Sequence, residues 1–142
     1  MKKFFDSTVD FCNIIPIKKR NEQYLNATTV CNNCDIPFAL ERVYYLYDVP
    51  TGEYRGGHAH KKLSEILIAA CGSFDVIIDD GRKDLKITLN RPDEGLLLYP
   101  GIWRELINFS SGAICLVLAS DKYYEEDYIR KYPAFLKEKI NG

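Results

Sequence analysis

The sequence predicts an all-β protein, a small β-barrel that carries a short helical appendage at its C-terminal end. Short apolar runs recur along the chain, and turn-forming residues such as Pro50, Gly81 and Gly101 separate them. Many short strands at this spacing are typical of barrels and sandwiches. The chain can also build a sizeable core, because 46% of its 142 residues are hydrophobic and 13% are aromatic. We therefore expect residues 1–142 to form a single domain.

The N-terminal arm, residues 1–35, has the weakest pattern, since Pro16 interrupts its short apolar patches. From residue 36 onward the runs become regular, and we place the barrel over residues 36–120. The candidate strands, rich in β-branched and aromatic residues, are residues 38–49, 63–71, 74–78, 85–89, 96–99, 103–109 and 114–119.

The first of these strands alternates, so it presents two different faces. Arg42, Tyr44 and Leu46 share one face with Asp48. The other face carries Val43, Tyr45, Tyr47 and Val49. Further along, the run Asp79-Asp80-Gly81-Arg82 predicts a hairpin in which Gly81 supplies a positive φ angle.

The tail, residues 121–142, departs from the strand pattern. Charged residues alternate there with aromatic and aliphatic ones, and Pro133 interrupts the run. This pattern predicts one or two short helices packed on the barrel.

Charge and cysteine content exclude several classes of protein. With 19 basic and 20 acidic residues, the chain lacks the basic footprint of a nucleic-acid-binding or polybasic membrane-bound protein. No apolar run approaches the roughly 18 residues of a membrane span. Five cysteines are an odd number, and a chain of this length needs no disulfide scaffold. We expect a reduced protein of the cytoplasm.

The only two histidines, His58 and His60, lie two residues apart and would share one face of a strand. The spacing around them is more specific than the pair alone. Gly52, His58, His60, Glu65 and Gly72 match the first cupin motif at every fixed position. A cupin is a jelly-roll β-barrel, in agreement with the strand pattern.

The second cupin motif is incomplete. Gly95, Pro100 and Asn108 lie near their expected places, but Arg104 occupies the position of the metal-binding histidine. A guanidinium stays protonated and is no ordinary metal ligand. We therefore assign no metal, although His58, His60 and Glu65 could still provide a two-histidine, one-carboxylate set.

Several segments between about residues 36 and 136 carry a resemblance to a known family. They include Arg42-Val43-Tyr44-Tyr45, Arg55-Gly56-Gly57-His58-Ala59-His60 and Asp127-Tyr128-Ile129-Arg130. In these segments the sequence resembles the nucleotide-sugar 3,4-ketoisomerases, also called WxcM-like cupins. It departs from them in the N-terminal arm and at Arg104, where a histidine often follows the tryptophan.

The resemblance implies a homodimeric isomerase that needs no cofactor. Its substrate would be a dTDP-linked 4-keto-6-deoxyglucose, whose carbonyl moves from C4 to C3. The product would supply an aminotransferase in the biosynthesis of 3-amino-3,6-dideoxy sugars.

Such a shift needs a base beside the carbonyl and a proton carrier between two oxygens, and histidine suits both tasks. By resemblance we assign His58 as the carbon base, with His60 as orienter or proton shuttle. Tyr44 is a further catalytic candidate. The candidate substrate-binding residues are Arg42, Arg55 and Arg104 for the enediolate or the diphosphate, Glu65 as the partner of Arg104, and Trp103, which either stacks on the thymine or fills the core.

Two alternatives remain open at this point. One is a metal-dependent cupin enzyme that uses His58, His60 and Glu65. The other is a non-catalytic module that binds nucleotide sugars, since a barrel can keep its binding site without the chemistry.

Overall fold

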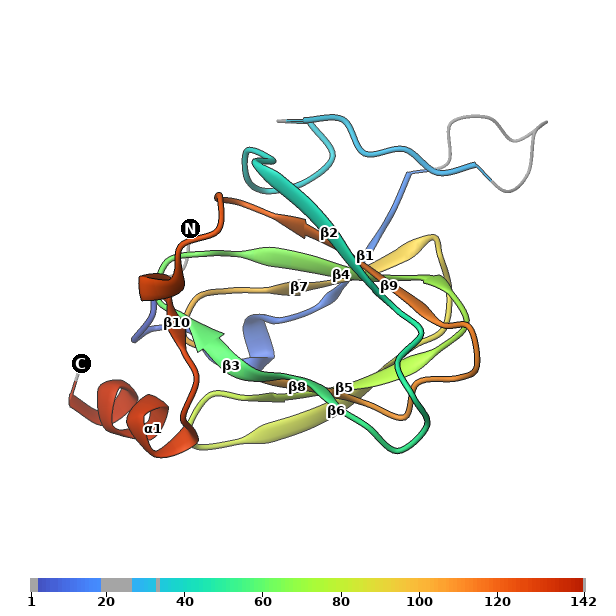
Figure 1. Cartoon of the computed structure of the whole chain (residues 1–142). Coiled ribbons are helices and arrows are strands. Elements are labelled where there is room, and N and C mark those ends of the chain that lie inside the picture. Colours follow the sequence, from blue (N-terminus) through green and yellow to red (C-terminus); the bar gives the residue numbers. More distant parts are fainter. Residues whose placement is uncertain (1–2, 19–26, 33, 142) are drawn as a thin grey trace.

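The computed structural model describes residues 3–18, 27–32 and 34–141 and is built on two antiparallel sheets of five strands each (Figure 1). The first sheet has the order β1-β7-β4-β9-β2 and the second the order β10-β3-β8-β5-β6. The strands are β1 (Ile14–Pro16), β2 (Arg42–Tyr47), β3 (Arg55–His60), β4 (Glu65–Cys71), β5 (Phe74–Asp79), β6 (Asp84–Leu89), β7 (Glu94–Leu98), β8 (Trp103–Ile107), β9 (Ile114–Ala119) and β10 (Tyr128–Ile129). None of the helices in these ranges is long and apolar enough to cross a membrane.

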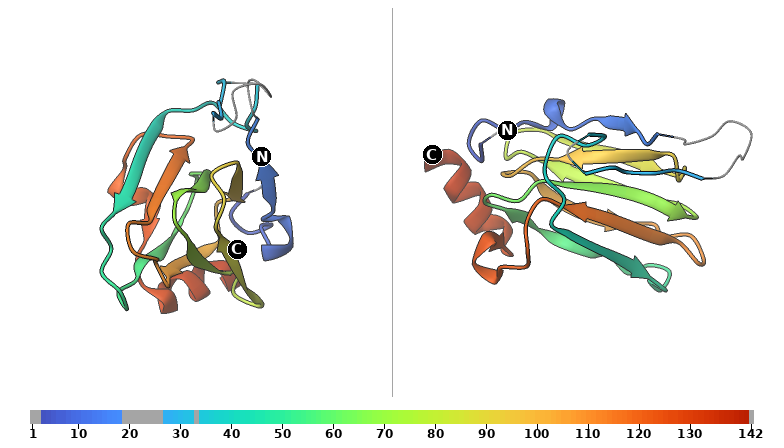
Figure 2. Two further views of the ribbon diagram at one scale, coloured as in Figure 1. Left: turned by 90° about the vertical axis from the view of Figure 1, so that its right-hand side faces the viewer. Right: turned by 90° about the horizontal axis from the view of Figure 1, so that it is seen from above.

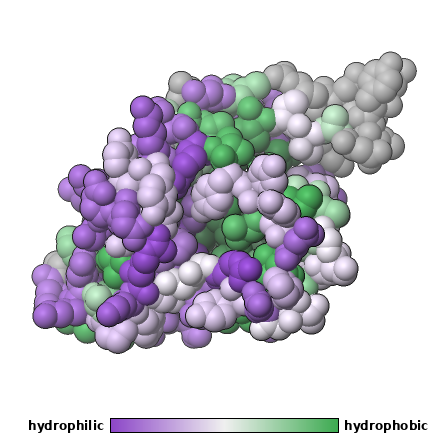
Figure 3. All heavy atoms as spheres, viewed as in Figure 1, coloured by the Kyte–Doolittle hydropathy of each residue, from purple (hydrophilic) through white to green (hydrophobic). Residues whose placement is uncertain are grey.

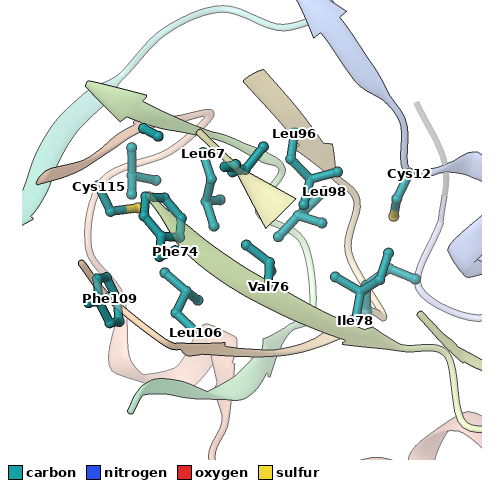
Figure 4. Packing of buried hydrophobic residues seen from close by; sticks show 14 of the residues in the cluster. Cys12, Leu67, Phe74, Val76, Ile78, Leu96, Leu98, Leu106, Phe109 and Cys115 are labelled. Atoms are coloured by element: carbon teal, nitrogen blue, oxygen red, sulfur yellow. The ribbon is translucent and has the colours of Figure 1, made fainter. Parts of the chain in front are cut away.

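Both sheets contribute to one core that lies between them (Figure 2). The first sheet provides Leu67, Leu96 and Cys115, and the second provides Phe74 and Val76, all at most 1% exposed. Figure 4 shows how these side chains converge between the strands. Burying each aliphatic side chain of this kind stabilises a fold by about 1.5–3 kcal/mol. The predicted all-β, jelly-roll architecture is confirmed.

The N-terminal arm is more regular than its sequence indicated. Residues of β1 pair with β7, from Ile14 opposite Leu96 to Pro16 opposite Glu94. Pro16 is tolerated because β1 is an edge strand, where one side of the backbone needs no ladder bond. Ile17 then joins a second apolar cluster on the outer face of the first sheet. The part of the arm spanning residues 19–26 lies outside the described residues.

The predicted hairpin is present, with β5 and β6 paired from Phe74 opposite Leu89 to Asp79 opposite Asp84. Gly81 has a φ of 91°, which a residue with a side chain rarely adopts. Asp80 completes the turn because its carboxylate accepts hydrogen bonds from the amides of Arg82 and Lys83.

The tail differs from the prediction in two ways. Pro133 does not interrupt the helix but lies in the first turn of α1 (Tyr132–Asn141), where its missing N–H removes no intrahelical bond. Before α1, a short 3-10 helix (η2, Glu125–Asp127) leads into β10, which pairs with the end of β3. On the face drawn in Figure 3, polar side chains gather on the side where these tail elements lie. Within the tail, β10 extends the second sheet and α1 covers it.

Candidate active site

A cavity of ≈ 230 Å³ lies between the two sheets and is lined by residues of both. Five of the predicted site residues line it, namely Tyr44, Arg55, His58, Glu65 and Arg104. The exposed Arg130 and the half-buried Arg55 mark its mouth. The strand alternation that the sequence predicted explains this convergence, because inward positions on different strands meet in the barrel interior.

The two histidines lie side by side, with ring centroids 4.9 Å apart. His60 is fully buried, and its Nε2 has no hydrogen-bond partner within the described part of the chain. Both ring nitrogens of His58 are likewise buried without a partner there. Buried polar atoms are nearly always hydrogen-bonded, so these three nitrogens indicate a place where a ligand binds.

Asp127 holds His60 in one orientation. Its Oδ2 lies 3.0 Å from His60 Nδ1, and its Oδ1 accepts a hydrogen bond of 2.8 Å from the amide of Lys62. The carboxylate is an acceptor, so Nδ1 of the neutral imidazole carries the proton. Nε2 of His60 is then the unprotonated nitrogen.

Glu65 joins Arg104 and Tyr44 in a buried network. One oxygen of Glu65 contacts Nη1 of Arg104, and the other accepts a hydrogen bond of 3.1 Å from the Tyr44 hydroxyl. Arg104 is only 1% exposed, and its Nε and Nη2 both donate to the carbonyl of Ile102. The predicted pairing of Glu65 with Arg104 is therefore present. It supplies the negative charge that a buried guanidinium requires.

The surroundings keep both histidines uncharged. Burial, together with the positive charge of Arg104, lowers the pKa of His58 to about 2. Burial also lowers the pKa of His60, although its hydrogen bond with Asp127 opposes the shift. Near neutral pH both imidazoles are thus free bases. Burial and the neighbouring Glu65 raise the pKa of Tyr44, which keeps its phenol protonated.

A metal ion fits this arrangement poorly. Ligand atoms of His58, His60 and Glu65 do lie within 4.8 Å of one another. However, the Glu65 carboxylate is already engaged by the Arg104 guanidinium. A cation bound there would meet that fixed positive charge in a low-dielectric interior.

The other predicted residues lie in different places. The Arg42 guanidinium lies over the rings of Tyr44 and Tyr123, at 5.2 and 5.5 Å, and its Nε and Nη2 are buried without a hydrogen-bond partner in the ranges described. Trp103 is not brought to the cavity. Its ring packs against Tyr132 and Phe135 in a separate apolar cluster, which the tail builds on the other face of the second sheet.

The sequence argument gave no site role to three residues of the tail. Asp127 binds His60, and the ring of Tyr128 lies 4.4 Å from that of His60 and 4.9 Å from that of His58. Arg130 lies over Tyr128 and forms a two-bond ion pair with Glu125. A strand of two residues gives no periodic signal, and only the resemblance of this segment to a known family pointed to it.

Comparisons with known proteins agree with this geometry. The family model FdtA, described as WxcM-like, C-terminal, matches residues 10–140. A TDP-4-oxo-6-deoxy-alpha-D-glucose-3,4-oxoisomerase of Aneurinibacillus thermoaerophilus is 45% identical over 130 residues, which cover 90% of this chain and 94% of that protein.

Two solved structures are similar throughout. A 3,4-ketoisomerase from Helicobacter canadensis is 42% identical, with a TM-score of 0.86 over 92% of this chain and 98% of that one. The sugar 3,4-ketoisomerase from Thermoanaerobacterium thermosaccharolyticum, in complex with TDP, is 38% identical, with a TM-score of 0.87 over 92% and 95%. A family model that spans most of the chain and similarity at this level over both sheets lead to one conclusion: the chain belongs to the WxcM-like family of 3,4-ketoisomerases.

Proposed function

We propose that the enzyme converts a dTDP-linked 4-keto-6-deoxyglucose to its 3-keto isomer, a precursor for 3-amino-3,6-dideoxy sugars. The observation that carries this proposal is the pair of neutral histidines whose buried nitrogens have no partner in the described ranges. The substrate follows from the names of the relatives, since one is a TDP-4-oxo-6-deoxyglucose 3,4-oxoisomerase and another was solved with TDP.

The histidines perform the proton transfers. His58 removes the proton from C3, and the electron pair moves through C4 to its oxygen, which gives an enediolate. His60 carries the proton of the C3 hydroxyl to the C4 oxygen through Nε2, the nitrogen that Asp127 leaves unprotonated. A proton then returns to C4 as the C3 carbonyl forms. No atom is gained or lost, and no redox partner is needed.

Positive charge stabilises the intermediate and the diphosphate. Arg104 is fixed beside the histidines, where its charge favours the enediolate over either ketone. Tyr44 offers a protonated hydroxyl at the same end of the cavity. A cavity of ≈ 230 Å³ is smaller than a typical pocket for a drug-sized ligand, so it suits the sugar ring. The nucleotide then lies toward the mouth, within reach of Arg55, while Arg42 is a second candidate for the diphosphate.

We also propose that the enzyme is a homodimer, which the outer face of β2 supports. Val43, Tyr45 and Tyr47 are 52%, 59% and 63% exposed on this edge strand. Exposed apolar patches on edge strands are typical sites of association.

The proposed location is the cytoplasm, where thiols stay reduced. Cys12, Cys34, Cys71 and Cys115 carry free thiols. We further propose that residues 1–142 form one domain, because β1 of the arm pairs with β7 and α1 of the tail packs on the second sheet.

The proposed function is tested by a proton NMR time course in heavy water. Chelator-treated protein is mixed with thymidine-diphosphate 4-keto-6-deoxyglucose. We expect a 3-keto product, with deuterium entering at C3 of the substrate or C4 of the product. An unchanged spectrum, with thymidine diphosphate bound in the same tube, would favour a binding module. Turnover that returns only with added metal would favour a metal-dependent cupin.

A further inference from the structure

The cavity has an apolar side that the proton transfers do not use. On three strands, the inward position two residues after a polar site residue is a leucine: Leu46 follows Tyr44, Leu67 follows Glu65 and Leu106 follows Arg104. Val117 completes the group, because the register places it between Tyr44 and Leu67. We call these four residues (Leu46, Leu67, Leu106 and Val117) the apolar wall.

The apolar wall is part of the packed core. Leu67, Leu106 and Val117 are at most 4% exposed and belong to the main core, against which Leu46 packs. Their side chains consist of carbon and hydrogen only, so they offer no hydrogen-bond partner to a bound hydroxyl. A hydroxyl placed against them would lose its hydrogen bonds to water without replacement.

A 6-deoxyhexose has one apolar substituent, the C6 methyl group. We propose that the apolar wall binds this methyl group and makes the enzyme select 6-deoxy sugars over their 6-hydroxy counterparts. This inference rests on the proposed function, and it also orients the ring. C3 and C5 flank C4, so a ring with C3 at the histidines and C4 beside Arg104 turns C5 and its methyl group away from His58. Along each strand the apolar wall lies two residues beyond these polar groups, about 6–7 Å away.

The first test compares two ligands that differ only at C6 and cannot react. Calorimetry gives the affinity of the wild-type enzyme for TDP-6-deoxyglucose and for TDP-glucose. We expect the deoxy sugar to bind about 10- to 100-fold more tightly, the discrimination that an apolar pocket achieves against an added hydroxyl. Affinities within about twofold of each other would overturn the proposal.

The second test uses Val117→Thr, which places a hydroxyl in the apolar wall with almost no change of shape. We expect the preference for the deoxy sugar to narrow by about 3- to 10-fold, because the new hydroxyl can partner the C6 hydroxyl of TDP-glucose. The matched control is Val76→Thr, which makes the same change at a fully buried core position that does not line the cavity. If both variants narrow the preference equally, the apolar wall does not determine it.

Leu46→Asn is a second variant in case Val117→Thr folds poorly, because Leu46 is only half-buried on the edge strand β2. Unchanged affinity for TDP alone shows that a variant is folded, since TDP lacks the hexose. Turnover of the 4-keto-6-deoxy substrate is measured separately. Tighter binding of TDP-6-deoxyglucose without turnover of the keto substrate would contradict the proposed ketoisomerase activity. Turnover with equal affinity for the two sugars would contradict only the role of the apolar wall.

Discussion

The two neighbouring imidazoles differ in what holds them. His60 is tied through Nδ1 to Asp127, whereas neither nitrogen of His58 has a partner in the described residues. The fixed tautomer of His60 suits it to pass a proton between two oxygens. The His58 ring packs against the rings of His60 and Tyr128, and its nitrogens remain available to a carbon acid. The different environments thus support different roles for two identical side chains.

Replacing His58 tests the assignment of the carbon base. We expect His58→Asn to reduce kcat by about 100- to 10,000-fold, which is the usual contribution of a general base. The affinity for thymidine diphosphate should stay within about twofold, because the nucleotide lies outside the sugar cavity. Steady-state kinetics and calorimetry measure the two quantities. If His58→Asn and His60→Asn both keep near-full activity, the acid–base assignment is wrong.

Asp127 is a positioning residue, and Asp127→Asn tests this. An amide can donate to Nδ1 and so favour the opposite tautomer of His60. We expect kcat to fall by about 100-fold or more with KM nearly unchanged. Asp127 also raises the pKa of His60, so residual activity should persist to lower pH than in the wild type.

The control for Asp127 is Glu126→Gln, the same chemical change at the preceding, exposed position. It should leave both kcat and the pH profile as they are. A loss of activity in Asp127→Asn that came with a higher KM and an unshifted pH profile would point to a merely structural role.

At the scale of elements, the sequence predicted much of how the strands around the cavity place their side chains. The alternation of β2 predicted that Arg42 and Tyr44 share one face, and both lie on its more buried face. The match to the first cupin motif predicted the proximity of His58, His60 and Glu65, and Arg104 was predicted to pair with Glu65. These features follow from period-2 geometry and local spacing, which a sequence displays directly.

Two other strands could not be predicted for a physical reason. β1 has three residues including Pro16, and β10 has two, so neither shows a period. Both form because a distant strand offers an open edge, β7 for the first and β3 for the second. Pairing energy between segments far apart in the chain leaves no local pattern, and Asp127 was missed as a site residue for the same reason.

The outer face of β2 leads to a prediction about assembly. We expect the double variant Tyr45→Ser, Tyr47→Ser to shift the protein from dimer to monomer at micromolar concentration, because the two exposed rings lie together with centroids 5.8 Å apart. Sedimentation velocity measures the change. Ile140→Ser is the control, since Ile140 is 78% exposed on α1 and should not affect assembly. A wild-type protein that sediments as a monomer would refute the dimer directly.

At the scale of the whole molecule, the uncharged histidines make stability depend on pH. In the unfolded chain each histidine titrates near pH 6.5, but burial lowers both pKa values in the fold, that of His58 to about 2. Below pH 6.5 the unfolded state therefore binds more protons than the native state. The free energy of unfolding must decrease as the pH falls through this range.

Urea unfolding between pH 7.5 and 5 measures this effect. We expect the midpoint to fall steadily as the solution becomes more acidic. Carboxylates contribute little in this range, because unfolded Asp and Glu titrate near pH 4. A double variant with His58→Asn and His60→Asn should show a clearly weaker dependence. Equal slopes for the variant and the wild type would mean that the histidines are not the buried neutral groups.

The bond between His60 and Asp127 also has a consequence for biosynthesis of the enzyme. The two residues are 67 positions apart, and Asp127 follows β9 in the chain. A growing polypeptide can already have formed the strands that carry His58, His60, Glu65 and Arg104 before Asp127 is present. Until then, nothing fixes which ring nitrogen of His60 carries the proton. Since domains are synthesised from the N-terminus onward, the site becomes competent only when the segment around Asp127 has left the ribosome and has docked on β3. Translation that stops before Asp127 would yield a barrel with every predicted site residue in place, but with no carboxylate to select the tautomer of His60.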